Sequence, residues 1–146
     1  METLLGVISP ANSQNYRQLS ALDLAFVGDG VYDLLAREQL LLGGSCPVKK
    51  LHQRKTAWVC CSAQAAALRA LWPSLTQEEQ AVALRGRNAH VGHVPKNAST
   101  ADYHGATALE TLFGWLYLAG ETGRVRELFA MSLEGVERQN GSAETT

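Results

Sequence analysis

Apolar residues recur at helical spacing along most of the chain, and no segment alternates polar and apolar positions for long enough to predict a strand. The first such pattern spans about residues 21–42, where Ser20 is expected to cap the start and the Gly43–Gly44 pair to close the end. Thr76 and Glu79 match a capping box at the start of the third predicted helix. The sequence therefore predicts an all-α fold. Further helices are expected at about 48–71, 77–85, 101–119 and 124–139.

Length and composition indicate one folded domain. The chain has 146 residues, of which 46% are hydrophobic and 18% charged, and this is enough for a single core. We expect an N-terminal arm at 1–18, one domain at 19–139 and a flexible polar tail at 140–146. No apolar run has the length of a membrane-spanning helix, and the start lacks the cationic region of a signal peptide. The expected location is therefore the cytoplasm, with no membrane partner.

Charge is unevenly distributed, although the net charge is only −1. Residues 39–101 carry eight Lys or Arg and two acids, a formal charge of +6, whereas 1–38 and 102–146 carry −3 and −4. A basic surface of this kind can grip a polyanion. It can equally consist of the solvated faces of ordinary helices, and charge alone does not separate these two interpretations.

Two of the predicted helices each carry an acid inside an apolar run. Asp29 and Asp33 lie one helical turn apart on the first of them, so their side chains share one face. Glu110 lies in the apolar stretch of the second. Burial of a carboxylate is costly unless a cation offsets it, and carboxylate oxygens are the ligands that Mg²⁺ prefers. The pattern predicts a metal site between two helices, with a solvated position for Glu110 as the alternative.

The segment from Arg85 to Asn97 is predicted to be a long loop. Its glycines allow a ligand to approach the backbone closely, and its Arg and Lys side chains can bind phosphates. Loops of about a dozen residues without secondary structure are commonly functional. The two histidines of this segment could bind a phosphate or remain solvated.

Three segments together resemble the ribonuclease III family. Residues 25–32, A-F-V-G-D-G-V-Y, resemble the family signature E-F-L-G-D-A/S-V-L. Residues 107–118, T-A-L-E-T-L-F-G-W-L-Y-L, resemble its second acidic segment, D-A-F-E-A-L-I-G-A-I-Y-L. Residues 85–97, R-G-R-N-A-(x)₅-P-K-N, are similar to a pattern of Mini-ribonuclease III, the short bacterial branch that has only the catalytic domain. The resemblance covers about residues 19–138 and implies a ribonuclease III endonuclease-domain-like helical bundle.

This resemblance implies a homodimeric, Mg²⁺-dependent endoribonuclease that hydrolyses double-stranded RNA to 5′-phosphate and 3′-hydroxyl ends, with Mn²⁺ as a substitute. The branch further suggests maturation of the 23S ribosomal RNA precursor of the large subunit, and no DNA partner is expected. Asp29 and Glu110 match the catalytic metal-binding positions, and Asp33 is an outer-shell candidate. Phe26 matches an aromatic residue of the family's dimer interface, where Gly28 and Gly30 would be small to admit a partner helix. The residues expected to bind RNA are Arg85, Arg87, Asn88, His90, Lys96 and Asn97.

Two departures from the family motifs reduce the number of acids. Ala25 stands where the signature has a glutamate, and Thr107 stands where the second segment has an aspartate. Only two of four close acidic ligands remain, so the number of metal ions is left open and water or RNA phosphate oxygens must complete the coordination shell. The alternative that these departures favour is a duplex-RNA-binding module without catalytic activity.

Overall fold

The computed structural model describes residues 16–89, 92–96 and 98–144. Residues 1–15 of the predicted arm at 1–18, His90 and Asn97 therefore lie outside the described residues. No strand occurs in the described part of the chain, which confirms the all-α prediction. The elements are α1 (Ala21–Leu42), α2 (Val48–Val59), α3 (Cys61–Leu71), the 3₁₀ turn η3 (Trp72–Ser74), α4 (Gln77–Arg87), α5 (Thr100–Leu118) and α6 (Thr122–Glu144).

Side-chain caps begin three of these helices, and the sequence predicts the first two. The Ser20 hydroxyl accepts a hydrogen bond from the backbone N–H of Asp23 at 3.1 Å, at the start of α1. The capping box of α4 is complete, because Thr76 and Glu79 each accept the other's backbone N–H, at 3.1 and 2.9 Å. Ser99 caps α5 in the same way as Ser20 caps α1. Each cap satisfies an N–H group that the helix itself leaves unpaired.

Three predicted boundaries are wrong. The single helix expected at 48–71 is broken at Cys60, whose backbone is extended (φ −66°, ψ 157°) and whose carbonyl accepts the first hydrogen bond of α3. The break lets α2 pack against α1 while α3 packs against α5. Helix α4 runs to Arg87, and α6 continues to Glu144. Gly86 and Arg87 of the expected loop are therefore helical, and the tail expected at 140–146 is helical as far as Glu144.

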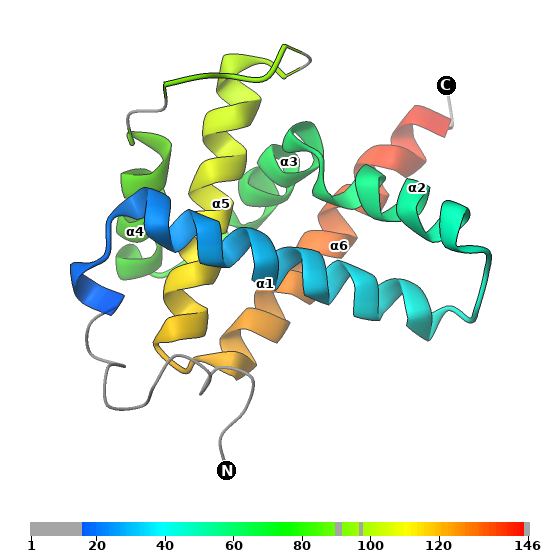
Figure 1. Cartoon of the computed structure of the whole chain (residues 1–146), viewed down its shortest axis with the longest axis horizontal. Helices are drawn as coiled ribbons and strands as arrows, with labels where there is room; N and C mark the ends of the chain where they lie inside the picture. Colours follow the sequence, from blue (N-terminus) through cyan, green and yellow to red (C-terminus); the bar gives the residue numbers. More distant parts are fainter. Residues whose placement is uncertain (1–15, 90–91, 97, 145–146) are drawn as a thin grey trace.

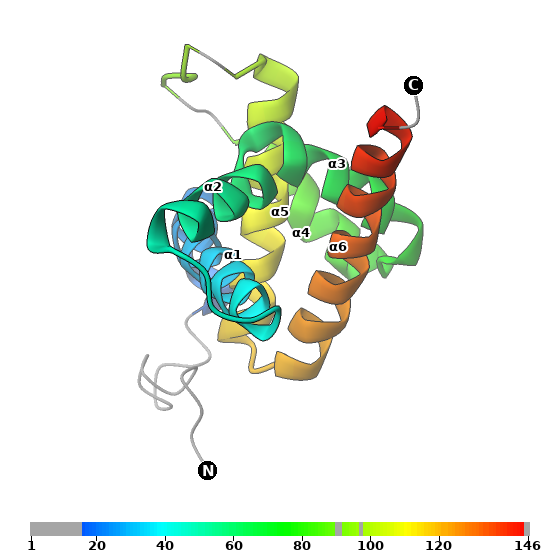
Figure 2. The same cartoon turned by 90° about the vertical axis from the view of Figure 1, so that its right-hand side faces the viewer.

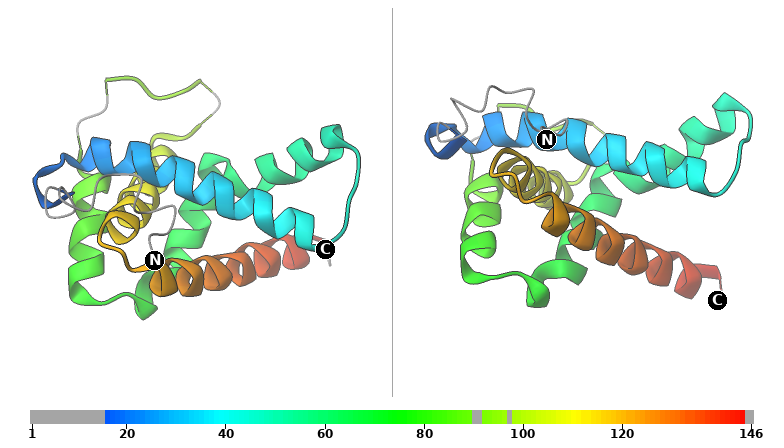
Figure 3. Two further views of the ribbon diagram at one scale, coloured as in Figure 1. Left: turned by 60° about the horizontal axis from the view of Figure 1, so that its bottom comes forward. Right: turned by 90° about the horizontal axis from the view of Figure 1, so that it is seen from below.

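Helix α5 is the central element of the bundle. Helix α1 crosses it on one side, and α3 and α4 pack along its other sides (Figure 1). Helix α6 runs beside α3, which places it on the far side of the bundle from the N-terminal end of α1 (Figure 2). After the turn that follows α1, helix α2 folds back along the C-terminal half of α1 (Figure 3). No helix in the described residues is both long and apolar enough to span a membrane.

Aromatic rings fill the core between α1, α5 and α6. Tyr32 makes edge-to-face contacts with Phe113 and Phe129, with ring centroids 5.2 and 5.3 Å apart. Its hydroxyl lies 3.2 Å from the Ser132 hydroxyl, so the buried polar end of the ring is satisfied. These contacts fix the C-terminal half of α1 against α5 and α6.

Helices α1 and α5 touch at backbone level through two glycines. A Cβ atom added at Gly28 would overlap the backbone carbonyl of Glu110, and one added at Gly114 would overlap the carbonyl of Leu24. Gly28 is therefore small because α5 of the same chain fills the adjacent space, which corrects the prediction that it is small to admit a partner helix. Gly30 has no atom within 4 Å of the corresponding position.

A largely buried ion pair joins α4 to α6. Arg124 donates two hydrogen bonds to the Glu79 carboxylate, both at 2.8 Å, and the carboxylate side chain is only 6% exposed. These hydrogen bonds from Arg124 hold the pKa of Glu79 below its ordinary value. Arg124 also contacts Glu127 at 2.9 Å, but that carboxylate is 60% exposed.

Arg124→Met is expected to destabilise the fold by about 3 kcal/mol, because it leaves the Glu79 carboxylate buried without its partner. Glu127→Gln is the matched control and should change stability by less than about 1 kcal/mol, since water screens that pair. The pKa of Glu79 is lowered in the folded chain, so its stabilisation is present above the ordinary value of 4.5 and is lost as the pH falls. Urea unfolding at pH 7 and pH 4 measures this, and an equal effect of both variants at pH 7 would contradict the prediction.

Gly28→Ala is expected to destabilise the fold by about 3 kcal/mol or more, because the added methyl group collides with backbone and not with a movable side chain. Gly30→Ala lies two residues away in the same helix and meets open space, so it should stabilise the isolated chain by up to about 1 kcal/mol. Thermal unfolding of both variants measures the contrast. Equal melting temperatures would rule out a backbone-level crossing at Gly28.

Candidate active site

The crossing of α1 and α5 brings two acids together. Gly28 lies against the backbone of Glu110, so Asp29, the next residue on α1, is a neighbour of the Glu110 side chain. Desolvation by burial, followed by the negative charge of Asp29, raises the pKa of Glu110 to about 8. Glu110 is half-buried and Asp29 is exposed. The alternative that Glu110 lies on a solvated face is therefore wrong.

Asp29 also prefers its neutral form more than an isolated aspartate does. Desolvation raises its pKa first, the negative charge of Asp33 raises it further, and the positive charge of Lys55 opposes both. Asp29 and Glu110 both disfavour ionisation, and neither forms an ion pair with a described side chain. Only the charge of Lys55, which is paired with Asp33, partly offsets that of Asp29. This is the electrostatic setting in which a bound cation is most favourable.

The donor set fits a hard divalent ion. Asp29 and Glu110 offer carboxylate oxygens from two facing helices, which suits Mg²⁺ or Mn²⁺. Within the described residues, no group of three or more His, Cys, Asp or Glu side chains could hold a metal ion. The two acids could therefore anchor an ion whose remaining ligands come from water or from a substrate.

The two positions where the family motifs carry further acids are packed into the protein. Ala25 is 7% exposed and Thr107 is 8% exposed. The Thr107 hydroxyl donates a hydrogen bond to the Tyr103 carbonyl of its own helix at 2.9 Å. Neither residue carries a carboxylate, and so this site has half the carboxylates of the family motifs.

Asp33 has cations on both of its oxygens. Arg37 lies 2.6 Å from one oxygen, and Lys55 lies 3.1 Å from the other. Desolvation raises the pKa of Asp33, but the hydrogen bonds from Arg37 and Lys55 outweigh it, so the pKa lies below its ordinary value. The sequence pattern treats Asp29 and Asp33 alike, whereas the fold gives one a carboxyl neighbour and the other two cations.

The residues expected to contact RNA lie in two different elements. Arg85 and Arg87 belong to the last turn of α4, and Arg85 donates a hydrogen bond to the Leu19 carbonyl at 3.2 Å. Arg87, Asn88 and Lys96 are exposed. The segment after α4 projects from the bundle at the N-terminal end of α5 (Figure 1). The described part of this segment, residues 92–96, therefore lies near the start of α5, the helix that carries Glu110.

An apolar strip runs along the exposed face of α1. Phe26 is 84% exposed and Leu22 is 40% exposed, and with Gly30 they follow one another at intervals of one helical turn. Such an exposed apolar strip is typical of a protein interface. The dimer expected through Phe26 and Gly30 stays a prediction, with this strip as its candidate surface.

Sequence reasoning did not single out two neighbours of the acid pair. The charge of Lys55 acts on Asp29, and the charge of Glu110 acts on Cys61, whose pKa is raised first by burial and then by that charge. Lys55 is one of several bases in the middle of the chain, and only its ion pair with Asp33 distinguishes it. No pattern in the sequence signals the position of Cys61, because it follows from the break at Cys60.

Comparisons with known proteins support the family resemblance. A profile of the Ribonuclease III domain matches residues 22–121. Mini-ribonuclease 3 of Symbiobacterium thermophilum is 42% identical over 120 residues, which cover 82% of this chain and 92% of that protein. Mini-ribonuclease 3 of Enterococcus faecalis is 36% identical over 129 residues, or 87% of this chain and 98% of that protein. A crystal structure of a Fusobacterium nucleatum protein shares the fold, with a TM-score of 0.73 and 25% identity over 82% of this chain and 95% of that one.

Glu110→Gln is expected to stabilise the metal-free protein at pH 8 by about 1–2 kcal/mol. The pKa of Glu110 is raised from 4.5 to about 8, so the unfolded chain ionises first and the folded state loses stability as the pH rises through this range. The glutamine variant avoids this loss, and the two proteins should be equally stable below about pH 4.5. Urea unfolding in EDTA across this range measures the difference. An unchanged stability at pH 8 would contradict the assigned burial of Glu110.

Proposed function

Because the chain belongs to the ribonuclease III family and to its short Mini-ribonuclease III branch, we propose that it is a Mg²⁺-dependent endoribonuclease of double-stranded RNA that matures the 23S ribosomal RNA precursor. Family membership makes the chain an endoribonuclease. The observation that carries the proposed mechanism is the convergence of Asp29 and Glu110 at the α1–α5 crossing. The proposed substrate is duplex RNA, and no cleavage of DNA is expected.

Asp29 and Glu110 would hold the divalent ion between them. A bound ion activates water for attack on phosphorus and stabilises charge on the leaving oxygen. Glu110 must lose its proton for its oxygen to act as a ligand, so loading at neutral pH releases this proton to solvent. Water adds to phosphorus while the bond to the 3′ oxygen breaks, which leaves 5′-phosphate and 3′-hydroxyl ends. Asp29 would bind the ion from α1 and Glu110 from α5. The crossing of these two helices fixes the two carboxylates relative to each other.

The exposed cations and amides after α4 suit the backbone of a duplex. A-form RNA has a wide, shallow minor groove, where proteins contact 2′-hydroxyl and phosphate groups more than base edges. Arg87 and Lys96 can bind phosphates, and Asn88 can bind hydroxyl groups. His90 and Asn97 are part of the same prediction, although both lie outside the described residues. Binding of this kind selects duplex shape with little sequence selection.

A homodimer would match the two strands of a duplex. Two identical sites related by a two-fold axis can each address one strand. The exposed strip that contains Leu22 and Phe26 supports an interface on α1, beside Asp29. Gly30 lies in this strip with open space around it, so in a dimer its lack of a side chain would admit the partner.

A second candidate function is duplex-RNA binding without cleavage. It is favoured by the absence of an acid at Ala25 and Thr107, both of which are packed against the protein. A chain of this kind would retain duplex RNA and leave it intact at any Mg²⁺ or Mn²⁺ concentration. The retained Asp29–Glu110 pair argues for the catalytic function.

Asp29→Asn is expected to lower cleavage of a long duplex RNA in Mg²⁺ by about 10³-fold, because it removes one of two carboxylate ligands and the ion that they hold. Asp23→Asn makes the same chemical change on an exposed acid of the same helix and should keep wild-type activity. Gel analysis of end-labelled RNA measures both. Equal cutting by all three proteins would refute this site, and an intact duplex in every tube would support the binding module.

Mapping of 23S ribosomal RNA ends in cells that lack this protein tests the proposed substrate. Unprocessed ends should accumulate, and they should disappear when the wild-type chain is restored but not when Asp29→Asn is restored. Unchanged ends would contradict the ribosomal role and would leave the duplex-cleaving activity to be judged separately in vitro.

A further inference from the structure

A cluster of three charged side chains lies beside the acid pair. Asp33 of α1 binds Arg37 of α1 at 2.6 Å and Lys55 of α2 at 3.1 Å. The Lys55 side chain is only 18% exposed, whereas the Arg37 side chain is 50% exposed. Lys55 is thus the more enclosed of the two cations, and it is the one contributed by a different helix.

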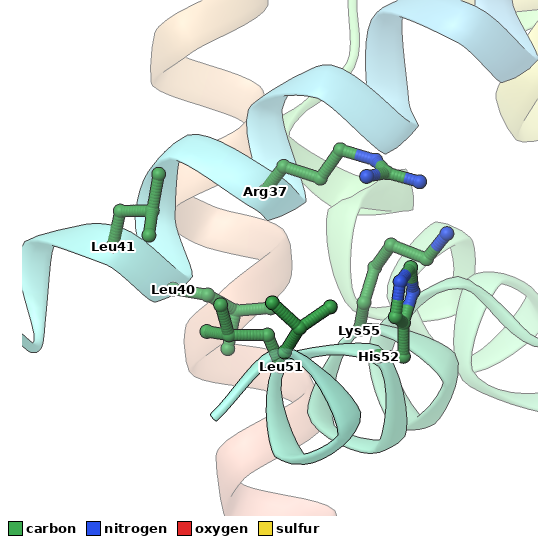
Figure 4. A pocket seen from close by; sticks show the side chains of 7 residues that line it. Arg37, Leu40, Leu41, Leu51, His52 and Lys55 are labelled. Carbon is green, nitrogen blue, oxygen red and sulfur yellow. The ribbon is translucent and has the colours of Figure 1, made fainter. Parts of the chain in front are cut away.

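The pocket between α1 and α2 explains how Lys55 is held. This pocket, of about 240 Å³, is lined by apolar side chains that include Leu40 and Leu51, with Arg37, His52 and Lys55 at its polar end. Figure 4 shows Arg37 and Lys55 extending from the two helices toward the same side, away from the apolar pair. The carbon chain of Lys55 can therefore lie along apolar surface while its ammonium reaches Asp33.

The ammonium of Lys55 is a fixed positive charge close to the site. Asp33 lies one helical turn after Asp29, on the same face of α1. Lys55 also exerts its charge on Asp29 itself. An ammonium has three N–H donors, and the ion pair with Asp33 uses one of them.

We infer that Lys55 is a substrate contact of the active site, whose ammonium is positioned by Asp33 and binds a phosphate oxygen of the RNA strand that Asp29 and Glu110 address. This inference rests on the proposed function. Phosphoryl transfer spreads negative charge over the phosphate oxygens, and fixed cations at these oxygens stabilise the transition state. With two carboxylates in place of four, the site recruits less metal charge. Lys55 supplies positive charge from the protein.

Asp33 is then a positioning residue and not an outer ligand of the metal. Both of its oxygens are engaged by cations, so it has little capacity left for metal-bound water. Arg37 holds one oxygen and thereby turns the other toward Lys55. Ion pairs that are partly exposed contribute about 0–1 kcal/mol to stability, so variants of this cluster should still fold.

The first experiment compares three single variants on duplex RNA in saturating Mg²⁺. Lys55→Met is expected to lower kcat by about 10²-fold, the typical loss when one donor to a developing charge is removed. Lys55→Arg keeps the charge and should restore most of kcat. Lys50→Met removes an exposed lysine of the same helix, which makes no ion pair with a described residue, and should keep the wild-type kcat.

The second experiment measures metal binding without RNA, by Mn²⁺ electron paramagnetic resonance. The double variant Asp33→Asn with Lys55→Met removes one negative and one positive charge, so the net charge of the site is unchanged. If Asp33 only positions Lys55, Mn²⁺ affinity of the double variant stays within about twofold of wild type while its kcat falls as in Lys55→Met. If Asp33 belongs to the metal shell, Mn²⁺ affinity falls and the inference is overturned.

Further outcomes separate this inference from the proposed function. A wild-type kcat in Lys55→Met, or an equal loss in Lys50→Met, would overturn the role of Lys55 and leave the endoribonuclease intact. If the wild-type chain cuts no duplex, the proposed function fails, and duplex affinity in EDTA then decides the contact. A loss of about fivefold or more in Lys55→Met beyond that in Lys50→Met supports the contact, and a smaller difference refutes it.

Discussion

The backbone contact between α1 and α5 is the constraint on which the rest of the structure depends. Gly28 and Gly114 let two helices approach until the carbonyls of Glu110 and Leu24 occupy the space of the missing side chains. Asp29 and Glu110 are far apart in the sequence, and this contact brings them together. Ala25 on α1 and Thr107 on α5 are also buried, with 7% and 8% of their surface exposed.

Neighbouring carboxylates repel each other, and the surrounding cations offset this repulsion at some of the acids and not at others. Glu110 has no cationic partner among the described residues and remains largely protonated at neutral pH without metal. Asp33 is fully paired, through Arg37 and Lys55. The negative charges of Asp29 and Glu110 are therefore left for a bound ion to neutralise, whereas protein side chains neutralise the charge of Asp33.

Local signals explain what the sequence predicts well. Helical spacing and the caps at Ser20 and Thr76 act within one or two turns, so they are readable without the fold. The break at Cys60 has no such signal, because no Pro or Gly marks it and packing of α2 and α3 on different partners decides it. The ion pair of Lys55 is also beyond sequence reasoning, since it depends on the path that brings α2 back along α1. The family resemblance identified Asp29 and Glu110, but it attributed the size of Gly28 to a partner chain.

The glycine contact has a consequence for the history of such chains. Gly28 and Gly114 are required by packing alone, so selection for a folded product retains them whether or not RNA is cut. The carboxyl pair does not stabilise the fold. Without an ion, burial and the charge of Asp29 make ionised Glu110 destabilising to the folded state. A descendant that had lost its chemistry would therefore shed the acids and keep the glycines. If Asp29 and Glu110 act as proposed, the two acids report on nuclease activity, whereas the two glycines report only on the fold.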